Sequence, residues 1–563
     1  MLTPEQLAHC ADDIINLYSQ LEEEIVRDIA RRIAKTGTMT DTGIWQAQHM
    51  QELGTLHSDV LSSVAKYSDR TESELKKLFE DAGVTATEYD NEIYRQNGLN
   101  PKSLKVSDVQ MQLLEAGYKK TQGNLSNLTL TTAVSSQTSF INACSLAELK
   151  ASSGAFTPQQ AIADAIKQVA QDGAYVIYPS GHRDRLDVAV RRNVTTGIGQ
   201  TTGQICLSNA QELGCDLMEI TAHAGARPSH AAWQGQIVSL SGQRGYLSLS
   251  DIGYGTGDGF KGWNCRHDWY PYFEGSSRMY SAKDLEELNA KNIEYPDSSM
   301  HTLYEAEQQQ RAMERKIRET KRILAAQDEC ITNTDSESLQ KAIQEDFERY
   351  AIKLKRQEAE MNNFCNRTGL LPDGSRSQVY GFGKSTSQKS TGVAKKYYRT
   401  WSKEHNINNI ETLAEYYNVK YNDIERYKLL KGYVKAIDEG NISPFTGFDL
   451  YESKADEIRR ELVGLKINSN PDYDITDFTT HFVDRVLGQT STKHKDMRLG
   501  TTLEQLKDTI ANPISISEPS FISMKKNGSV YLDKRVKFTG KSCSFVYSIT
   551  DKLLIQATSF GGG

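Results

Sequence analysis

The chain has 563 residues, of which 25% are charged and 38% hydrophobic, and its formal net charge at pH 7 is -7. This length exceeds what one ordinary hydrophobic core accommodates, so we expect several domains. We find no signal-peptide pattern, no run of about 18 apolar residues and no CxxC pair among the eight cysteines, which predicts a protein made in a cytosol without membrane spans or a disulfide framework.

Residues 1–122 are predicted to form a helical module. Between residues 7 and 33 apolar side chains recur at spacings of three, four and seven, which is typical of amphipathic helices. Residues 123–300 differ, because short apolar runs, small polar residues and a glycine series from Gly253 to Gly259 predict a mixed α+β domain with functional loops. Those glycines are followed by KGWNC and not by a helix, which excludes a dinucleotide-binding loop.

The second half of the chain contains four further predicted segments. Residues 301–370 fit two long charged helices that form an antiparallel hairpin, and residues 371–394 are a Gly/Ser-rich linker. A helical segment, 395–470, precedes a C-terminal domain, 471–563, with two helices and then short alternating strands. The predicted fold class is therefore multidomain α+β, with an antiparallel sheet in the small C-terminal domain.

Charge is distributed unevenly along the sequence. From Arg376 to the end there are 28 Lys and Arg against 22 Asp and Glu, a net of +6, whereas the rest carries 38 against 51, a net of -13. Within the basic part, four cations alternate with Tyr397, Tyr398 and Trp401: Lys395, Lys396, Arg399 and Lys403. Cations neutralise phosphates and aromatic rings stack on bases, so this stretch is a candidate for contact with packaged DNA or an RNA substrate. The alternative is a solvated amphipathic helix.

The motif richest in chemistry is GWNCRHDWYPYFEG, which contains Cys265 and His267 among aromatic residues, and TAHAGARPSHAAWQG upstream adds His223 and His230. Gly225 and Pro228 predict a loop for the two upstream histidines, and a strand would place Cys265 and His267 on one face. Together the four residues are a candidate zinc site. The spacing matches no standard zinc finger, so an aromatic-packed, hydrogen-bonded core remains the alternative. A Cys/His nucleophile finds no further support in the sequence.

These motifs resemble the minor capsid protein 2 family of tailed phages, which is related to MuF-type head morphogenesis proteins. The resemblance rests on HAGARPSHAAWQG, GYGTGDGFKGWNCRHDWYPYFEG and YEAEQQQRAMERKIRETKR, covers residues 1–370 and places the MuF-like domain at 123–300. It implies a structural protein of the virion, made in the host cytoplasm, that associates with portal and capsid proteins and assists head assembly or DNA packaging and ejection. The family's frequent Asn-Cys-Arg-Cys form is Asn-Cys-Arg-His here, at 264–267, and histidine keeps the capacity to bind metal.

The C-terminal domain is weakly similar to the group of nucleases that includes barnase, EndoU, colicins and RelE. Helices followed by a small antiparallel sheet, with His481 and Arg485 one helical turn apart and Thr558 on the last strand, carry this similarity. It implies an alternative function, in which the head protein delivers a metal-independent ribonuclease-like effector with His481, Arg485 and Thr558 as catalytic residues. In the opposing interpretation His481 is an ordinary helix residue and the domain is decorative or binds a partner.

Overall fold

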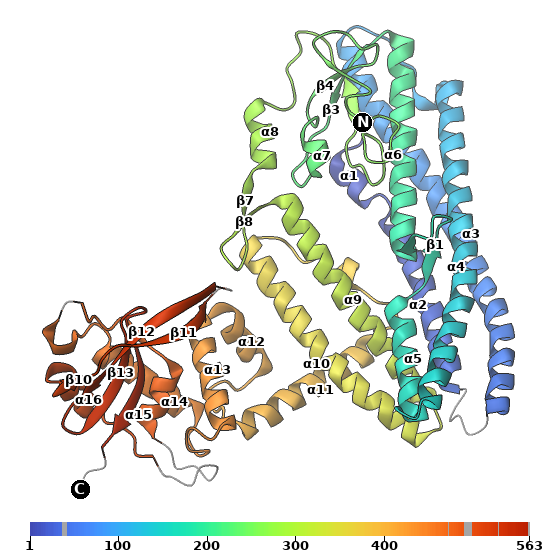
Figure 1. Cartoon of the computed structure of the whole chain (residues 1–563). Helices are drawn as coiled ribbons and strands as arrows, with labels where there is room; N and C mark the ends of the chain where they lie inside the picture. Colours follow the sequence, from blue (N-terminus) through green and yellow to red (C-terminus); the bar gives the residue numbers. More distant parts are fainter. Residues whose placement is uncertain (36–41, 471, 489–497, 527–528, 561–563) are drawn as a thin grey trace. The chain divides into compact units, whose positions relative to one another are not determined.

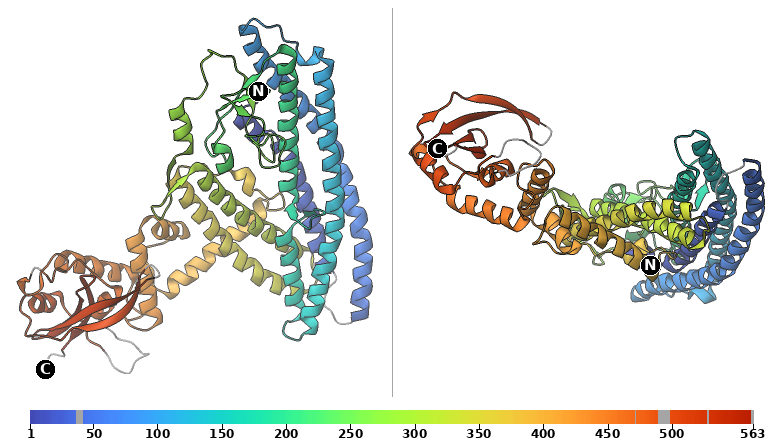
Figure 2. Two further views of the ribbon diagram at one scale, coloured as in Figure 1. Left: turned by 45° about the horizontal axis from the view of Figure 1, so that its top comes forward. Right: turned by 90° about the horizontal axis from the view of Figure 1, so that it is seen from below.

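The computed structural model contains two compact units, Met1–Thr391 and Gly392–Gly563 (Figures 1 and 2). The structure describes residues 1–35, 42–470, 472–488, 498–526 and 529–560. No helix within these ranges has the length and apolar character that a membrane span needs. All eight cysteines lie within them as free thiols, and only Cys10 is not fully buried.

Long helices dominate the first unit. They are α2 (Asp12–Lys35), α3 (Thr42–Gln96), α4 (Asp108–Ser152) and α6 (Leu186–Leu213). In Figure 1, α3, α4 and α6 run side by side in blue and green. Shorter helical elements join them: α1 (Pro4–His9), η1 (Leu104–Val106), α5 (Pro158–Asp172), α7 (Pro228–Ala231) and α8 (Ala282–Asn289). Thr157 shows why one of them starts where it does, because its side chain accepts from the backbone N–H of Gln160 while Pro158 occupies the first helical position.

Helices α4 and α6 approach each other closely through small residues. A Cβ at Gly117 of α4 would lie 2.0 Å from Oγ1 of Thr201 on α6, and a Cβ at Gly197 of α6 would lie 2.2 Å from Oγ1 of Thr121 on α4. The two reciprocal Gly–Thr contacts leave no space for a larger residue on either helix. The absence of side chains at these two positions therefore sets the distance between the two helices.

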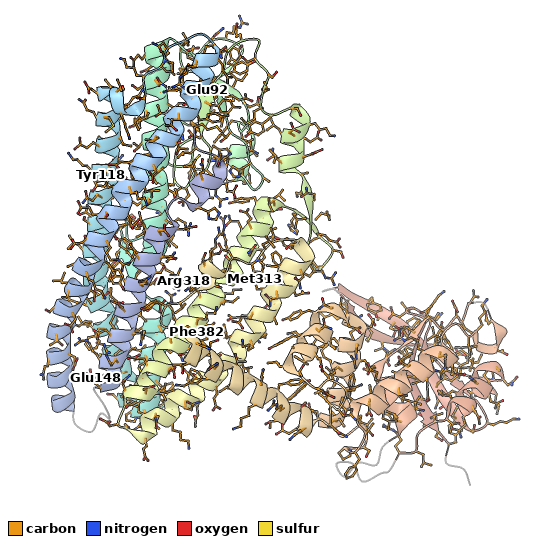
Figure 3. All side chains as sticks on the ribbon, turned by 180° about the vertical axis from the view of Figure 1, so that it is seen from behind. Glu92, Tyr118, Glu148, Met313, Arg318 and Phe382 are labelled. Carbon is orange, nitrogen blue, oxygen red and sulfur yellow. The ribbon has the colours of Figure 1, made fainter. Side chains whose placement is uncertain are left out.

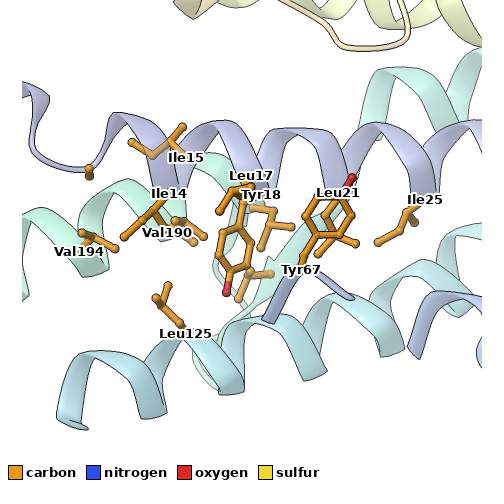
Figure 4. Close-up of a cluster of buried hydrophobic side chains, with 14 of the residues drawn as sticks. Ile14, Ile15, Leu17, Tyr18, Leu21, Ile25, Tyr67, Leu125, Val190 and Val194 are labelled. Carbon is orange, nitrogen blue, oxygen red and sulfur yellow. The ribbon is translucent and has the colours of Figure 1, made fainter. Parts of the chain in front are cut away.

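One continuous hydrophobic core runs through the first unit, with members from Leu2 to Ile343. Figure 4 shows part of it, where Ile14, Leu17 and Leu21 of α2 meet side chains of α3, α4 and α6, including Tyr67, Leu125, Val190 and Val194. Helix α4 crosses residue 122, so the sequence position at which composition changes is not a boundary in this core. The division between the two units falls at residue 391, inside the segment predicted as a linker.

Buried charges join α2 to α9 (Leu303–Asn333). The fully buried carboxylate of Glu22 accepts from Arg322 and, at 3.3 Å, from Arg318, and Arg318 also donates to Asp187 at 2.5 Å. Figure 3 labels Arg318 on α9. Breaking such a buried pair leaves an uncompensated charge in the interior, so this network fixes one relative position of the helices.

The predicted hairpin at 301–370 is present. Helix α9 is followed by α10 (Glu337–Thr368), and the two helices lie antiparallel and pack along their lengths. The second half of the predicted linker is helical, because η2 (Gly374–Ser377) is followed by α11 (Lys384–Glu404). In that stretch Thr386 and Lys389 bond to Asp328 of α9, and Ser390 is fully buried. Tertiary contacts thus order a Ser/Thr-rich sequence whose composition favours a flexible chain.

The strands of the first unit are short. A four-stranded sheet has the order β5-β4-β3-β6, with β3 antiparallel to β4 and β6 and with β4 parallel to β5. Its strands are β3 (Leu217–Ile220), β4 (Ile237–Ser239), β5 (Leu247–Ser248) and β6 (Trp269–Pro271). Two separate hairpins are β1 (Tyr175–Ile177) with β2 (Arg183–Arg185) and β7 (Lys291–Glu294) with β8 (Met300–Thr302). The pairing of β3 with β6 brings the two candidate metal-binding motifs together.

The second unit has helices first and a sheet last, as predicted. Its helices after α11 are α12 (Leu413–Asn422), α13 (Ile424–Asp438), α14 (Phe448–Leu462), η3 (Ile467–Ser469), α15 (Thr480–Leu487) and α16 (Leu503–Ala511). Its strands are β9 (Asp477–Phe478), β10 (Ser515–Ile516), β11 (Ser520–Lys526), β12 (Ser529–Thr539), β13 (Cys543–Ser548) and β14 (Leu553–Ser559). The sheet order is β10-β12-β13-β14-β9, with β11 beside β12, and only β9 pairs parallel to its neighbour. The multidomain α+β class is confirmed.

Candidate metal centre

The upstream motif turns out to contain a short helix. His223 follows β3 on a loop, but Pro228 occupies the first position of the one-turn helix α7, which carries His230. The expectation that both histidines lie on a loop is therefore wrong for His230. Proline tolerates this position because its missing N–H would have no partner in the first turn of a helix.

The downstream motif lies on a tight loop, and the strand expected there begins only at Trp269. A Cβ at Gly259 would lie 2.0 Å from the carbonyl oxygen of Gly253, so the loop folds back on its own backbone. Lys261 and Asn264 have φ angles of 59° and 52°. Such left-handed conformations are uncommon for residues other than glycine and persist only when the surroundings enforce them.

Three of the four predicted ligands come together. The Nδ1 atoms of His230 and His267 lie 3.3 Å apart, and Sγ of Cys265 lies 3.7 Å from Nδ1 of His267 and 4.0 Å from Nδ1 of His230. All three residues are buried. The prediction that Cys265 and His267 face the same side is met in this loop without a strand.

The outer nitrogen of each ring faces a carbonyl oxygen. Nε2 of His230 lies 2.8 Å from the carbonyl oxygen of Asp258, and Nε2 of His267 lies 3.2 Å from Oε1 of Gln234. That Gln234 oxygen also accepts from the backbone N–H of His223, which fixes the orientation of the amide. Since an oxygen of this kind only accepts, each Nε2 carries the proton and each Nδ1 presents a lone pair to the centre.

Burial keeps both imidazoles neutral. Desolvation lowers the pKa of His230 to about 4 and lowers the pKa of His267 well below its usual value, and the pKa of the Cys265 thiol is raised by burial. Two neutral rings with lone pairs facing each other repel unless a cation or a proton lies between them. A metal ion satisfies both rings and favours the thiolate form of Cys265.

The distances fit a tetrahedral zinc ion. Zn–N bonds of about 2.0–2.1 Å and a Zn–S bond of about 2.3 Å separate two nitrogen ligands by about 3.4 Å and nitrogen from sulfur by about 3.6 Å. The observed separations are 3.3 Å, 3.7 Å and 4.0 Å. Hydrogen bonds from the outer ring nitrogens to oxygen acceptors are the arrangement that orients histidine ligands in metal sites.

His223, the fourth predicted ligand, lies beside this set and not in it. Its ring lies against that of His267, with centroids 4.6 Å apart, and its Nδ1 lies 2.8 Å from the carbonyl oxygen of Ala224. The cluster of ligand atoms within mutual reach, among described residues, consists of His230, Cys265 and His267.

Aromatic rings surround the cluster, so the packed-core interpretation also describes part of the site. The ring of Trp233 lies 4.4 Å from His230 and 4.9 Å from His267, and Phe260 lies 4.9 Å from the fully buried Trp269. Trp263 is different, because it is 55% exposed and covers Gly257 from outside. Trp263 is therefore not part of the packed centre, although it belongs to the same aromatic motif.

The residues that orient the site are not recognisable in the sequence. Gln234 and the carbonyl group of Asp258 were not singled out, and neither was the buried ion pair of Lys261 with Asp268, whose atoms lie 2.5 Å apart. Asp268 also accepts from the backbone N–H of Leu2, which links the loop to the start of the chain. The only available signal was a charged residue beside Trp269 in an otherwise aromatic stretch.

The predicted nucleic-acid residues all lie on α11 and are exposed: Lys395, Lys396, Arg399 and Lys403. No carboxylate of the described chain lies within ion-pair distance of them. The aromatic residues do not interleave with these cations, because Tyr398 is buried in the core of the second unit and Trp401 packs against that core. Tyr397 is exposed, but at 100° per residue it lies on a different side of the helix. Contact of the four α11 cations with phosphates stays a prediction. The positions of the aromatic residues do not support base stacking beside these cations.

The predicted catalytic residues of the second unit are only partly brought together. Nε of Arg485 donates to Nε2 of His481 at 3.3 Å, so the lone pair that a general base would use is already engaged. Thr558 pairs with Ser544, while the adjacent pair of Ala557 and Phe545 faces the core that α15 covers. Since side chains alternate along a strand, Thr558 points to the opposite face of the sheet from α15. Catalysis by this set stays a prediction.

The comparisons with known proteins match the sequence of this chain to a family of phage proteins. A family model described as phage minor capsid protein 2 matches residues 2–366, which is most of the first unit and includes the whole candidate metal centre. The chain belongs to this family, as its resemblance predicts. The family match places the chain among phage minor capsid proteins.

One similar protein is a "Structural protein" of Lactococcus phage LL-H. It is 26% identical over 250 residues, a stretch that covers 41% of this chain and 66% of that relative, so the match spans just under two thirds of the relative's length. No solved structure matches the chain significantly.

Proposed function

We propose that the protein is a minor component of a phage head, placed at the portal or on the capsid interior, where it assists head assembly or DNA packaging and ejection. The observation that carries this proposal is the coincidence of the family match, residues 2–366, with one unit built around a single continuous core. A long rigid bundle with one core is suited to bridging neighbouring proteins in an assembly.

A surface of the first unit supports association with another structural protein of the head. Helix α4 has no charged residue between Thr121 and Ala147. Its exposed side carries Leu130, Val134 and Ile141, which are 56%, 61% and 39% exposed. These spacings of four and seven place the three side chains on one face. Exposed apolar faces of this kind mark sites of protein association.

We further propose that the His230, Cys265 and His267 cluster binds zinc as a structural clip. The ligands come from α7 and from the loop before β6, so one ion would join a helix to a loop whose first ligand lies 35 residues further along the chain. The clip would hold the face formed by β3 and β6 in place for assembly.

The test uses phage particles that carry variants of this protein. Replacing Leu130 and Val134 together by lysine should strongly reduce the amount of the protein in purified heads, measured by quantitative mass spectrometry. Val106→Lys is the matched control, because Val106 is 69% exposed but lies on η1, outside the α4 face. Normal incorporation of the double variant would exclude α4 as the docking face, and absence of the wild-type protein from heads would refute the proposed function itself.

A further inference from the structure

A cavity of about 690 Å³ opens beside the candidate metal centre. His223, His230 and His267 form one wall of it, residues of α1, α2 and the start of α6 form another, and α9 with η2 closes the third side. The volume lies in the range of about 300–1,000 Å³ that small-ligand sites occupy.

The charges that line this cavity are strongly one-sided. Eight arginines and three carboxylates, Asp12, Asp187 and Glu314, contribute side chains, which leaves a formal excess of five positive charges. This count leaves out the three histidines of the wall. This excess is found in a unit that belongs to the acidic part of the chain, so overall composition does not explain it.

Some of the arginines are already paired. Arg191 lies 3.2 Å from Asp12, Arg318 lies 2.5 Å from Asp187, and Arg376 lies 3.0 Å from Asp373. Arg311 lies 2.9 Å from Glu307, and Arg185 donates to the carbonyl oxygen of Gln171. These contacts hold the cationic wall in place and consume the nearby carboxylates.

Four arginines have no carboxylate within ion-pair distance in the described part of the chain: Arg185, which donates to a carbonyl oxygen, and Arg227, Arg266 and Arg315. Arg227 donates only to the carbonyl oxygen of Trp263, at 2.7 Å. Arg266 lies between the ligands Cys265 and His267 and is half-buried. Burial lowers its pKa; of the nearby charges, the carboxylate of Glu307 opposes this and three arginines, Arg376, Arg191 and Arg227, add to it. Burial lowers the pKa of Arg311 to about 10, and the charges of Arg266 and Arg376 add to this effect. Like charges at this density destabilise the site when it is empty of an anion.

Phosphate is the anion that guanidinium groups match best. The planar fork of arginine donates two parallel hydrogen bonds to a phosphate, and several forks around one cavity can bind more than one phosphate or all sides of a terminal one. The cavity is too small for duplex DNA, whose major groove alone is about 12 Å wide. A compact ligand, or the end of a strand, fits instead.

We propose that this arginine cavity binds a ligand through phosphate groups, either a free nucleotide or the terminal phosphate of a nucleic-acid strand. Arg227, Arg266 and Arg315 bind the phosphates, and the paired arginines around them supply positive potential. The site does not depend on whether the protein occupies the portal or the capsid wall, because binding is a property of the isolated chain.

The experiment is isothermal titration calorimetry of the full chain with five probes: pyrophosphate, ATP, a 5′-phosphorylated trinucleotide, the same trinucleotide with a 5′-hydroxyl, and citrate as a carboxylate control. We expect pyrophosphate to bind, with weaker binding as salt rises. Tighter binding of ATP indicates a free nucleotide as the natural ligand, whereas a preference for the 5′-phosphorylated over the 5′-hydroxyl trinucleotide indicates a strand end. Both outcomes support a phosphate site.

The variants separate this cavity from general surface charge. Arg315→Gln should weaken pyrophosphate binding about tenfold, the loss expected when one charge-assisted contact is removed, and Arg227→Gln with Arg315→Gln should weaken it further. Arg356→Gln on α10 is the matched control, because Arg356 is exposed and does not line the cavity. Circular dichroism and a thermal melt verify that each variant folds. Absence of pyrophosphate binding, equal loss in the Arg356 control, or equally tight binding of a tricarboxylate such as citrate would overturn the proposal.

Discussion

The Nδ1 atoms of His230 and His267 lie 3.3 Å apart in the interior of the first unit, while the outer nitrogen of each ring faces an oxygen that can only accept. Two lone pairs therefore point at each other, with Sγ of Cys265 beside them. An arrangement of this kind is unfavourable without a cation. It is the strongest argument that the cluster is built for a metal ion.

Purified protein should accordingly contain about one zinc ion per chain, measured by elemental analysis. The Cys265→Ala, His267→Ala double variant should contain none, and a chelator should lower the melting temperature of the wild-type protein but not that of the variant. Cys144→Ala controls for loss of a buried thiol, since Cys144 is equally buried and lies on α4. Equal zinc content in the wild-type protein and the double variant would refute the assignment.

The glycine loop before the cluster gives a second prediction. Gly259→Ala should destabilise the first unit by about 3 kcal/mol, because the added Cβ would lie 2.0 Å from the carbonyl oxygen of Gly253 and the backbone must move. Gly54→Ala on α3 should instead stabilise the unit by about 0.5–1 kcal/mol, since nothing lies within 4 Å of its Cβ position and alanine favours a helix interior. Thermal melts should show a lower melting temperature for Gly259→Ala and a higher one for Gly54→Ala than for the wild-type protein. A neutral Gly259→Ala would mean that the loop is loosely held.

Features that depend on local sequence could be predicted, whereas features that depend on contacts in the folded chain could not. Helices with apolar stripes, such as α2, could be predicted because their period is local. The convergence of His230, Cys265 and His267 could be suspected from residue types, but the positive φ angles of Lys261 and Asn264 and the partners Gln234 and Asp258 depend on the folded loop. Helix α11 could not be predicted from its first residues, because contacts of Thr386 and Lys389 with Asp328 decide its conformation.

A third prediction concerns pH. Burial raises the pKa of Glu23 from 4.5 to about 8, and neither of its carboxylate oxygens has a hydrogen-bond partner among the described residues. The folded protein therefore keeps a proton on Glu23 that the unfolded chain releases between pH 4.5 and 8, so this group makes the free energy of unfolding fall as pH rises through that window. The slope is about 1.4 kcal/mol per pH unit for one proton.

Glu23→Gln should remove this slope, because glutamine stays neutral at all pH values. The variant should gain melting temperature relative to the wild-type protein at pH 8 by more than it does at pH 6. Glu80→Gln, at an exposed position of α3, controls for the general effect of one fewer negative charge. If the difference between Glu23→Gln and the wild-type protein were the same at both pH values, the raised pKa would be wrong.

The last prediction tests whether the second unit is a ribonuclease. A mechanism with His481 as base and Thr558 as partner needs both side chains at one phosphate, but Nε2 of His481 accepts from Arg485 and the alternation along β14 turns Thr558 to the other face of the sheet. We therefore expect that the full chain does not cleave tRNA without metal ions through His481. Any residual cleavage should be the same in the wild-type protein and in the His481→Ala variant. The assay compares the wild-type protein with His481→Ala and Thr558→Ala at several pH values, with EDTA present to exclude metal-dependent contaminants. Cleavage by the wild-type protein that both substitutions eliminate would establish the nuclease and would require the second unit to rearrange around its substrate.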